Sequence, residues 1–241
     1  MTQPRERDVP AADAAIVVAI DGPSGSGKSS VARAVARRLG LSYLDTGAMY
    51  RALTWWCRER GIDLADSAAV ARAARELPLE MGVDPAAPSV TVGGTPVDAA
   101  IREAGISASV SAVATNLDVR TELVRRQRDL IAEARSQAGG VVAEGRDITT
   151  VVAPEAEVRI LLIADEAARL ARRATEVHGQ ADSSAVAAVH DLVVRRDRDD
   201  SSVAQFHQAA DGVVTVDTSA LDLQQSIEAV LSVVGANAVS R

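Results

Sequence analysis

Short runs of apolar residues alternate along the chain with longer segments in which apolar residues recur at helical spacing. Four short runs, rich in β-branched residues, are predicted to be buried strands: 16–20, 141–143, 158–163 and 213–216. Helical spacing predicts helices over 29–39, 166–177 and 221–234, and over 107–137, which lacks Gly and Pro and should form one or two helices. Strands that alternate with helices imply an α/β fold with a mostly parallel sheet covered on both faces.

The segment from about 77 to 105 interrupts this alternation, because prolines and glycines are frequent in it. Within it, 89–97 is predicted to form a strand, a tight glycine turn and a second strand. We therefore expect an inserted subdomain with an antiparallel hairpin. A second segment, 195–202, is almost entirely charged, and we expect it to be irregular.

The composition is that of a folded globular protein, with 47% hydrophobic and 24% charged residues. Only five residues are aromatic, so the core must consist mainly of Ala, Val, Leu and Ile. The net charge of −7 argues against a protein that coats nucleic acid, which needs a broad basic surface. The single cysteine, Cys57, excludes an internal disulfide and any cysteine-built metal site, and it suits a reducing compartment.

The first long apolar run, 14–20, is far too short to span a membrane, and the residues before it have no signal-peptide pattern. These features predict a cytoplasmic protein with a mobile leader over 1–14. We expect it to be a monomer with neither a membrane nor a nucleic-acid partner.

Residues 22–29 match in full the phosphate-binding loop pattern G-x-x-x-x-G-K-[ST], between a predicted strand and a predicted helix. The glycines let backbone N–H groups turn inward around a phosphate chain, and the helix N-terminus adds positive potential. Lys28, the only lysine in the sequence, is expected to reach the β- and γ-phosphates of ATP, and the Ser29 hydroxyl to bind Mg²⁺. The expected ATP-binding residues are Gly22, Pro23, Ser24, Gly25, Ser26, Gly27, Lys28, Ser29 and Ser30.

Other motifs narrow the class of nucleotide-binding protein. A GTPase needs an Asn-Lys-x-Asp motif to read its base, and a sequence whose one lysine is Lys28 cannot contain it. ATP-driven motors usually have an apolar strand that ends in Asp-Glu, and no convincing example is present. The short chain therefore indicates a small-molecule kinase.

Motifs spread over most of the chain resemble those of bacterial cytidylate (CMP) kinases. They are found, in order, at 20–29, 44–51, 119–120, 125–128, 144–147 and 196–201. The resemblance implies a P-loop kinase core with a parallel five-stranded sheet flanked by helices. It also implies a small antiparallel-sheet insertion that binds the nucleoside monophosphate (NMP), and a short lid.

The resemblance also gives expected domain boundaries. The core should comprise 15–66 and 107–241, the NMP-binding insertion 67–106, and the lid region 172–203 within the core. The insertion inferred from composition falls inside the one that the resemblance implies.

For the acceptor nucleotide, the resemblance implies two groups of residues. Cytosine would be read by Ser111, Arg120 and Asp147, whose donor and acceptor types suit its N4 amine and its N3 and O2 acceptors. Three residues expected on a loop after the first helix, Thr46, Tyr50 and Arg51, would hold the monophosphate. Asp45 could orient Mg²⁺ through water.

The resemblance further assigns Arg146 and Arg196 to phosphate contacts and Asp200 to the pentose, so that the catalytic residues would be Lys28, Arg146 and Arg196. Uracil would face the wrong partners at Arg120 and Asp147.

Structural alternatives exist for several of these residues. Asp147 could be a helix N-cap, Ser111 and Arg120 could lie on solvated helix faces, and Tyr50 could be a core aromatic residue. We expect Trp55 and Trp56 to be packing residues. We expect the histidines, which have no metal-ligand spacing, to lie on the surface: His178, His190 and His207.

The sequence departs from the family pattern after Asp200. The family commonly has an arginine three residues later, where this chain has Val203, and the Ser-Pro that usually follows is missing. Arg195 or Arg198 could replace the lost phosphate contact, or each could belong to a solvated charge run.

The sequence as a whole predicts a kinase that transfers the γ-phosphoryl group of ATP, bound with Mg²⁺, to CMP and dCMP, giving ADP and CDP or dCDP. Two alternatives stay open. One is a kinase of the same architecture for another acceptor, such as a different nucleotide, gluconate or shikimate. The other is a non-catalytic nucleotide-binding protein in which Val203 marks a degenerate lid.

Overall fold

A computed structural model describes residues 15–239. A five-stranded parallel sheet with the order β2-β6-β1-β7-β8 forms its centre. The strands are β1 (Ile16–Asp21), β2 (Ser42–Asp45), β6 (Gly140–Gly145), β7 (Val158–Ile163) and β8 (Val214–Asp217). The α/β class and the five-stranded sheet are therefore confirmed, and the predicted leader, 1–14, lies outside the described residues.

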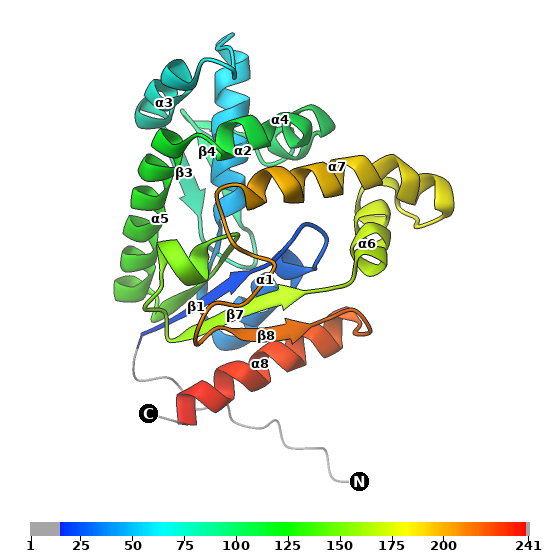
Figure 1. The fold of residues 1–241 in the computed structure, drawn as a ribbon. Coiled ribbons are helices and arrows are strands. Elements are labelled where there is room, and N and C mark those ends of the chain that lie inside the picture. Colours follow the sequence, from blue (N-terminus) through cyan, green and yellow to red (C-terminus); the bar gives the residue numbers. More distant parts are fainter. Residues whose placement is uncertain (1–14, 240–241) are drawn as a thin grey trace.

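Helices cover both faces of this sheet (Figure 1). Alternate residues of a strand point to opposite faces, so Val18 and Ile20 pack against α1 (Lys28–Leu39) and α8 (Leu223–Val239). Val17 and Ala19 belong to the opposite core, together with residues of α2 (Thr46–Glu59), α3 (Ser67–Glu76), α4 (Ala104–Ala114) and α5 (Leu117–Gln137). Ala, Val, Leu and Ile dominate both cores, as the composition predicted.

The predicted helical stretch 107–137 is divided between α4 and α5 at Thr115 and Asn116. The Asn116 side chain caps α5 by accepting hydrogen bonds from the backbone N–H groups of Asp118 and Val119. This cap directs the new helix, and with it Arg120, toward the end of the sheet where β6 ends.

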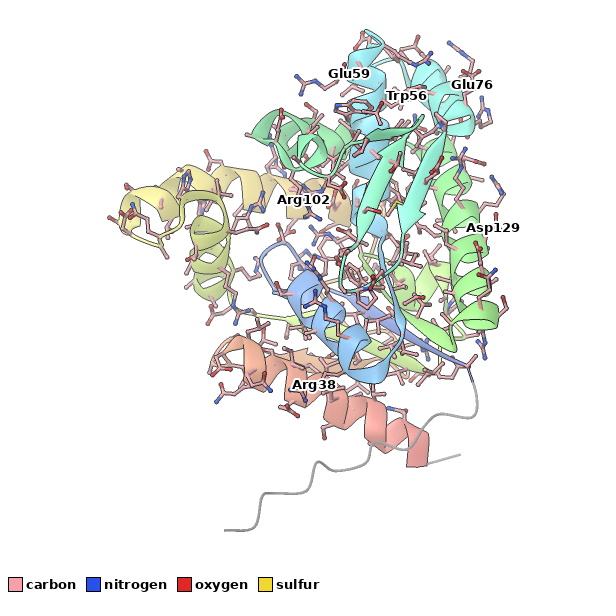
Figure 2. All side chains as sticks on the ribbon, turned by 180° about the vertical axis from the view of Figure 1, so that it is seen from behind. Arg38, Trp56, Glu59, Glu76, Arg102 and Asp129 are labelled. Atoms are coloured by element: carbon pink, nitrogen blue, oxygen red, sulfur yellow. The ribbon has the colours of Figure 1, made fainter. Side chains whose placement is uncertain are left out.

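The expectation of a loop over Thr46, Tyr50 and Arg51 is wrong, because all three lie on the first turns of α2. Asp45 ends β2 and caps this helix, its Oδ1 accepting from the Ala48 N–H at 2.9 Å. The change from strand to helix takes place at this one residue, without an intervening loop. Trp56 lies toward the far end of α2, half-buried against the core, as expected for a packing residue (Figure 2).

A second, antiparallel sheet consists of β3 (Leu79–Gly82), β4 (Ser89–Val92) and β5 (Thr95–Pro96). The predicted hairpin over 89–97 is confirmed, and its turn residues Gly93 and Gly94 both have positive φ. The backbone after β3 is held to α1: Arg33 and Arg37 each donate to the carbonyl oxygens of Pro85 and Ala86, at 2.8–3.1 Å. A 3₁₀ turn, η1 (Ala100–Arg102), leads from this sheet to α4.

Helices α6 (Glu166–His178) and α7 (Ser183–Ser201) form a hairpin that projects from the end of the sheet where β1 and β7 end (Figure 1). The hairpin has a small apolar cluster of its own: Leu170, Ala174, Ala185, Val189 and Val193. The expectation of an irregular segment over 195–202 is wrong, since α7 continues to Ser201. Its charges pair within the helix and with neighbouring elements, as in the i,i+4 pair of Arg196 and Asp200.

The remaining helical element, η2 (Ile148–Val152), is a π-helical turn directly after the 144–147 motif. All three histidines are exposed, as predicted: His178, His190 and His207. Within residues 15–239, no helix is both long enough and apolar enough to cross a membrane.

The start of β1 and the start of β6 approach each other closely. Gly140 pairs with Ile16 and has φ 134, and a Cβ on Gly140 would lie 1.9 Å from the Ile16 carbonyl oxygen. Its neighbour Gly139 also has positive φ, but a Cβ there would meet nothing within 4 Å.

We expect Gly140→Ala to lower the free energy of unfolding more than Gly139→Ala. Both variants carry the backbone strain of a positive φ, about 1–2 kcal/mol, but only the first adds overpacking, about 1–3 kcal/mol more. Urea unfolding of both variants and the wild type measures the difference. If both variants lose the same free energy of unfolding, the close approach of Gly140 to the Ile16 carbonyl oxygen does not limit the residue at position 140.

Candidate functional site

A cavity of about 450 Å³ lies at the carboxyl ends of the parallel strands. Its walls come from the 24–30 loop and α1, the start of α2, the second half of α4, the start of α5, the 144–147 motif, the α6–α7 hairpin and the start of α8. Ligands of open parallel α/β sheets bind at this edge of the sheet. Among the predicted site residues, only Gly22, Pro23 and Ser111 do not line the cavity.

The phosphate-binding loop joins β1 to α1 with the backbone that its glycines allow. Gly25 and Gly27 have φ of 75 and 88, and a Cβ on Gly25 would lie 2.4 Å from the Arg169 carbonyl oxygen. Gly27 begins α1 without a side-chain cap, which leaves the first N–H groups of the helix for an anion. The Ser26 hydroxyl is buried in this loop and has no hydrogen-bond partner among the described residues.

Gly22 and Pro23 support the loop from behind. A Cβ on Gly22 would lie 2.2 Å from the Leu162 carbonyl oxygen, so only glycine fits there without movement. The Gly22 carbonyl oxygen accepts from Arg146 at 3.0 Å, and that of Pro23 accepts from Lys28 Nζ at 3.4 Å. These two residues hold the loop and its cations in place.

Lys28 is buried near two arginines and two carboxylates. Burial, with the charges of Arg146 and Arg196, lowers the pKa of its ammonium group to about 8, although the Glu144 and Asp45 carboxylates oppose the shift. A phosphate chain beside this ammonium group would favour its charged form and raise its pKa again.

Glu144, near the end of β6, is a site residue that sequence reasoning missed. Its buried carboxylate accepts hydrogen bonds from the Ser29 hydroxyl at 2.6 Å and the Tyr43 hydroxyl at 3.1 Å. Asp45 ends the neighbouring strand β2 directly beside it, and burial together with the Asp45 charge raises the pKa of Glu144. Ser29 and these two carboxylates form a set of hard oxygen donors, which fits Mg²⁺.

The predicted acceptor residues lie across the cavity on α2. The Thr46 hydroxyl donates to the Glu144 carbonyl oxygen at 2.8 Å, and Arg51 donates to Ser107 Oγ at 3.2 Å. Tyr50 lines the cavity between them, and its hydroxyl has no hydrogen-bond partner among the described residues. The alternative that Tyr50 is a core aromatic is partly right, since the residue is 8% exposed and also belongs to the larger core.

Arg120 and Asp147 form an ion pair inside the cavity. The side chains are only 13% and 6% exposed, so Arg120 does not lie on a solvated face. Asp147 occupies the N-cap position of η2, as one alternative expected, but its side chain makes no capping hydrogen bond. Burial raises the pKa of Asp147 even though Arg120 opposes this shift. Ser111, in contrast, lies outside the cavity, which α4 lines with Val110 and Ala114.

Arg146 is fixed by several partners. Besides the Gly22 carbonyl, its guanidinium contacts Asp197 at 3.1 Å and Asp200 at 3.3 Å, and it stacks on Phe206 at 4.4 Å. Asp197 also accepts from the Ser24 N–H at 3.0 Å and pairs with Arg169. A single carboxylate thereby connects the phosphate loop with α6 and α7.

Arg196 lies in the most positive part of the cavity. Its pKa falls to about 9, first through burial and then through the charges of Arg51 and Arg146. Asp200 Oδ2 lies 3.7 Å from its Nε, but the Nε has no hydrogen-bond partner within the described residues. The site therefore concentrates cations where an anion would bind.

Neither expected substitute for the missing lid arginine reaches the cavity. Arg195 and Arg198 are exposed, and Val203 lines the cavity in their place. Sequence reasoning missed three arginines that do line it: Arg102, Arg172 and Arg173. Arg102 lies in η1, before α4, and its guanidinium is 3.7 Å from the Asp45 carboxylate. Arg172 donates to the Ser26 carbonyl oxygen at 3.1 Å. For Arg172 and Arg173, the sequence did contain a signal: their spacing from Arg169 places all three on one face of a helix.

The strand–loop–helix unit and the cavity that it shares with the helical hairpin define a P-loop kinase fold. A family model described as cytidylate kinase matches residues 18–236. The chain belongs to the cytidylate kinase family.

Relatives of known name agree with this assignment. The cytidylate kinase of Streptomyces avermitilis is 49% identical over 91% of this chain and 93% of its own length. That of Cutibacterium acnes is 48% identical over 91% of this chain and 96% of its own length. Among solved structures, shikimate kinase from Acinetobacter baumannii aligns over 95% of this chain and 98% of its own, with 16% identity and a TM-score of 0.41, too low to support a conclusion.

We expect ATP affinity, measured without an acceptor, to fall as the pH rises above about 8. The pKa of Lys28 lies near 8 in the free protein, so at higher pH the lysine must take up a proton when the phosphate chain binds. The dissociation constant should then rise toward about tenfold per pH unit.

Lys28→Arg is the matched control, because a guanidinium keeps its charge throughout this range. Its affinity can differ from that of the wild type, but isothermal titration between pH 7 and 8.5, below the pKa of about 9 of Arg196, should show a nearly flat profile. The same slope in both proteins would contradict the assignment to Lys28.

Proposed function

We propose that this protein transfers the γ-phosphoryl group of ATP to CMP and dCMP, giving ADP and CDP or dCDP. The observation that carries the proposal is the buried Arg120–Asp147 ion pair, which shares one cavity with the phosphate-binding loop. The family assignment and the near-complete coverage of cytidylate kinase relatives support the same activity.

The Arg120–Asp147 pair has the chemistry to read cytosine. A carboxylate accepts from the N4 amine, and a guanidinium donates to the N3 and O2 acceptors. Uracil presents N3–H and O4 at these positions, so buried polar groups would be left unpaired at about 1–3 kcal/mol each. The wall of Val110 and Ala114 adds an apolar surface beside the pair.

Phosphoryl transfer requires positioning and charge stabilisation, and no covalent intermediate with the protein is needed. Lys28 and the α1 N-terminus would hold the donor phosphates, and Arg51 and Arg146 the monophosphate. Arg196 would lie near the moving group. Mg²⁺, held with the ATP phosphates by Ser29 and near Glu144 and Asp45, would neutralise phosphate charge.

Two elements would enclose the reactants. The segment 67–106 would act as the NMP-binding insertion and 172–203 as the lid, within a core of 15–66 and 107–241. Closure excludes water, which would otherwise take the phosphoryl group. The separate apolar cluster of the α6–α7 hairpin supports its movement as a unit. The Arg33 and Arg37 contacts to the 85–86 carbonyls would limit how far the insertion moves.

We also propose that the enzyme is a cytoplasmic monomer. The single cysteine, Cys57, is free and buried, and burial raises its pKa to about 11. A thiol of this kind is inert, and it fits a protein that needs no disulfide.

A coupled assay of ADP release with CMP, dCMP, UMP and AMP tests the proposed activity. Turnover of CMP and dCMP well above that of UMP and AMP is expected. Comparable turnover of another nucleotide would favour a kinase for a different acceptor. If no acceptor is turned over, a non-catalytic nucleotide-binding protein would be favoured.

We expect Asp147→Asn to lose kcat/KM for CMP much more than for UMP. The amide keeps the shape but directs a donor at the cytosine amine, and it can rotate to offer that donor to the O4 of uracil. The CMP/UMP ratio should narrow by about tenfold or more, which corresponds to about 1.4 kcal/mol.

Asp191→Asn, on the exposed part of α7, is the control and should leave the ratio unchanged. The melting temperature of each variant separates base reading from a purely structural role. An unaltered ratio in Asp147→Asn would contradict the base-reading assignment.

A further inference from the structure

Asp21 is a buried carboxylate that the proposed mechanism does not use. It is the last residue of β1, is only 1% exposed and does not line the cavity. Its side chain points to the same face of the sheet as those of Val17 and Ala19, which belong to the larger apolar core. A charged group is costly to bury in such surroundings, so its presence there calls for an explanation.

Three hydrogen bonds hold this carboxylate, and all of them come from the start of η2. The N–H of Ile148 donates to Oδ1 at 2.8 Å, and the N–H and hydroxyl of Thr149 donate to Oδ2 at 2.8 and 2.6 Å. Burial raises the pKa of Asp21 to about 6, and these hydrogen bonds oppose the shift. The group is therefore ionised at neutral pH and can accept at both oxygens.

Asp21 does for η2 what the residue at the N-cap usually does. The first N–H groups of a helical turn have no partner within it, and an N-cap aspartate commonly accepts from them. Asp147 has that position and a suitable side chain, yet it makes no capping hydrogen bond. A carboxylate from another element of the fold caps the turn in its place, and the Asp147 carboxylate pairs with Arg120 in the cavity.

We propose that Asp21 is a positioning residue for the acceptor nucleotide: by capping η2 it leaves the Asp147 carboxylate free to face the base. The inference rests on the proposed CMP kinase activity and deepens it. Ile148 and Thr149 are both buried, so without Asp21 their N–H groups would lack an acceptor and could not turn to solvent. The adjacent Asp147 carboxylate would then cap the turn itself and leave the cavity.

Asp21→Asn tests the proposal, because the amide keeps the shape of the carboxylate but accepts on one side only. Whichever way it rotates, one N–H of η2 faces a donor. We expect the CMP/UMP ratio of kcat/KM to narrow by about tenfold, as in Asp147→Asn, because the Asp147 carboxylate leaves the base. The dissociation constant of ATP, measured without an acceptor, should stay near that of the wild type.

Two further variants separate positioning from a general loss of structure. Adding Asp147→Asn to Asp21→Asn should narrow the ratio little further, since both changes take the same carboxylate from the base. Thr149→Val removes one of the three hydrogen bonds and keeps the branched shape, so it should narrow the ratio by a smaller factor. It also serves if Asp21→Asn does not fold. In the free protein, amide hydrogen exchange at Ile148 and Thr149 should be faster in either variant.

Glu157→Gln is the matched control. The Glu157 carboxylate is also largely buried and accepts from a backbone N–H of β1, that of Val17 at 2.8 Å, but at the end of the strand away from the cavity. Whatever its effect on the melting temperature, this variant should leave the ratio unchanged.

The proposal is overturned by an unchanged ratio in Asp21→Asn and Thr149→Val, or by an equal narrowing in Glu157→Gln. It is also overturned if the effects of Asp21→Asn and Asp147→Asn on the ratio add fully. If the wild type itself does not turn over CMP, the proposed function fails instead. Hydrogen exchange needs no substrate, so unchanged exchange at 148–149 would refute the capping role even then.

Discussion

The mutual repulsion of cations around one cavity is the constraint on which the rest of the site depends. Lys28, Arg51, Arg146 and Arg196 come from four different elements and face a common space. Burial, and after it the repulsion between these cations, lowers the pKa of Lys28 to about 8 and that of Arg196 to about 9. A phosphate chain bound here would offset this repulsion with attraction to all four cations.

Buried carboxylates make this concentration of charge tolerable. Asp197 joins the Ser24 N–H, Arg146 and Arg169, so that the phosphate loop, the 144–147 motif and both helices of the hairpin share one anion. Movement of the hairpin would therefore alter the contacts of the loop and of Arg146 at the same time. The charge network thus couples the position of α6 and α7 to the arrangement of the phosphate site, without any contact to the base.

The sequence predicted what local patterns determine. The phosphate-binding loop, four strands and the 89–97 hairpin follow from residue order and spacing, and the residues of the Arg120–Asp147 pair from a family resemblance. It did not reveal β2, because Ser42–Asp45 has polar ends and is buried only through its neighbours. The charge run over 195–202 predicts an irregular segment, but the segment is helical. Its charges are paired partly by residues distant in the chain, such as Arg146 and Arg169, which a local pattern cannot show. Glu144 could not be assigned for the same reason: its role depends on Ser29, Tyr43 and Asp45, which the fold places beside it.

The repulsion between cations in the cavity explains why Val203 can stand where the family resemblance leads us to expect an arginine. A further cation here would add to a cavity in which the repulsion among Arg51, Arg146 and Arg196 is already large. The segment after Asp200 instead supplies Phe206, the only phenylalanine in the sequence, which is fully buried. The Arg146 guanidinium stacks on the Phe206 ring. A cation–π contact stabilises an arginine without neutralising it, whereas another carboxylate would weaken its attraction for phosphate. The segment after α7 therefore orients an existing arginine of the cavity and adds no further charge to it.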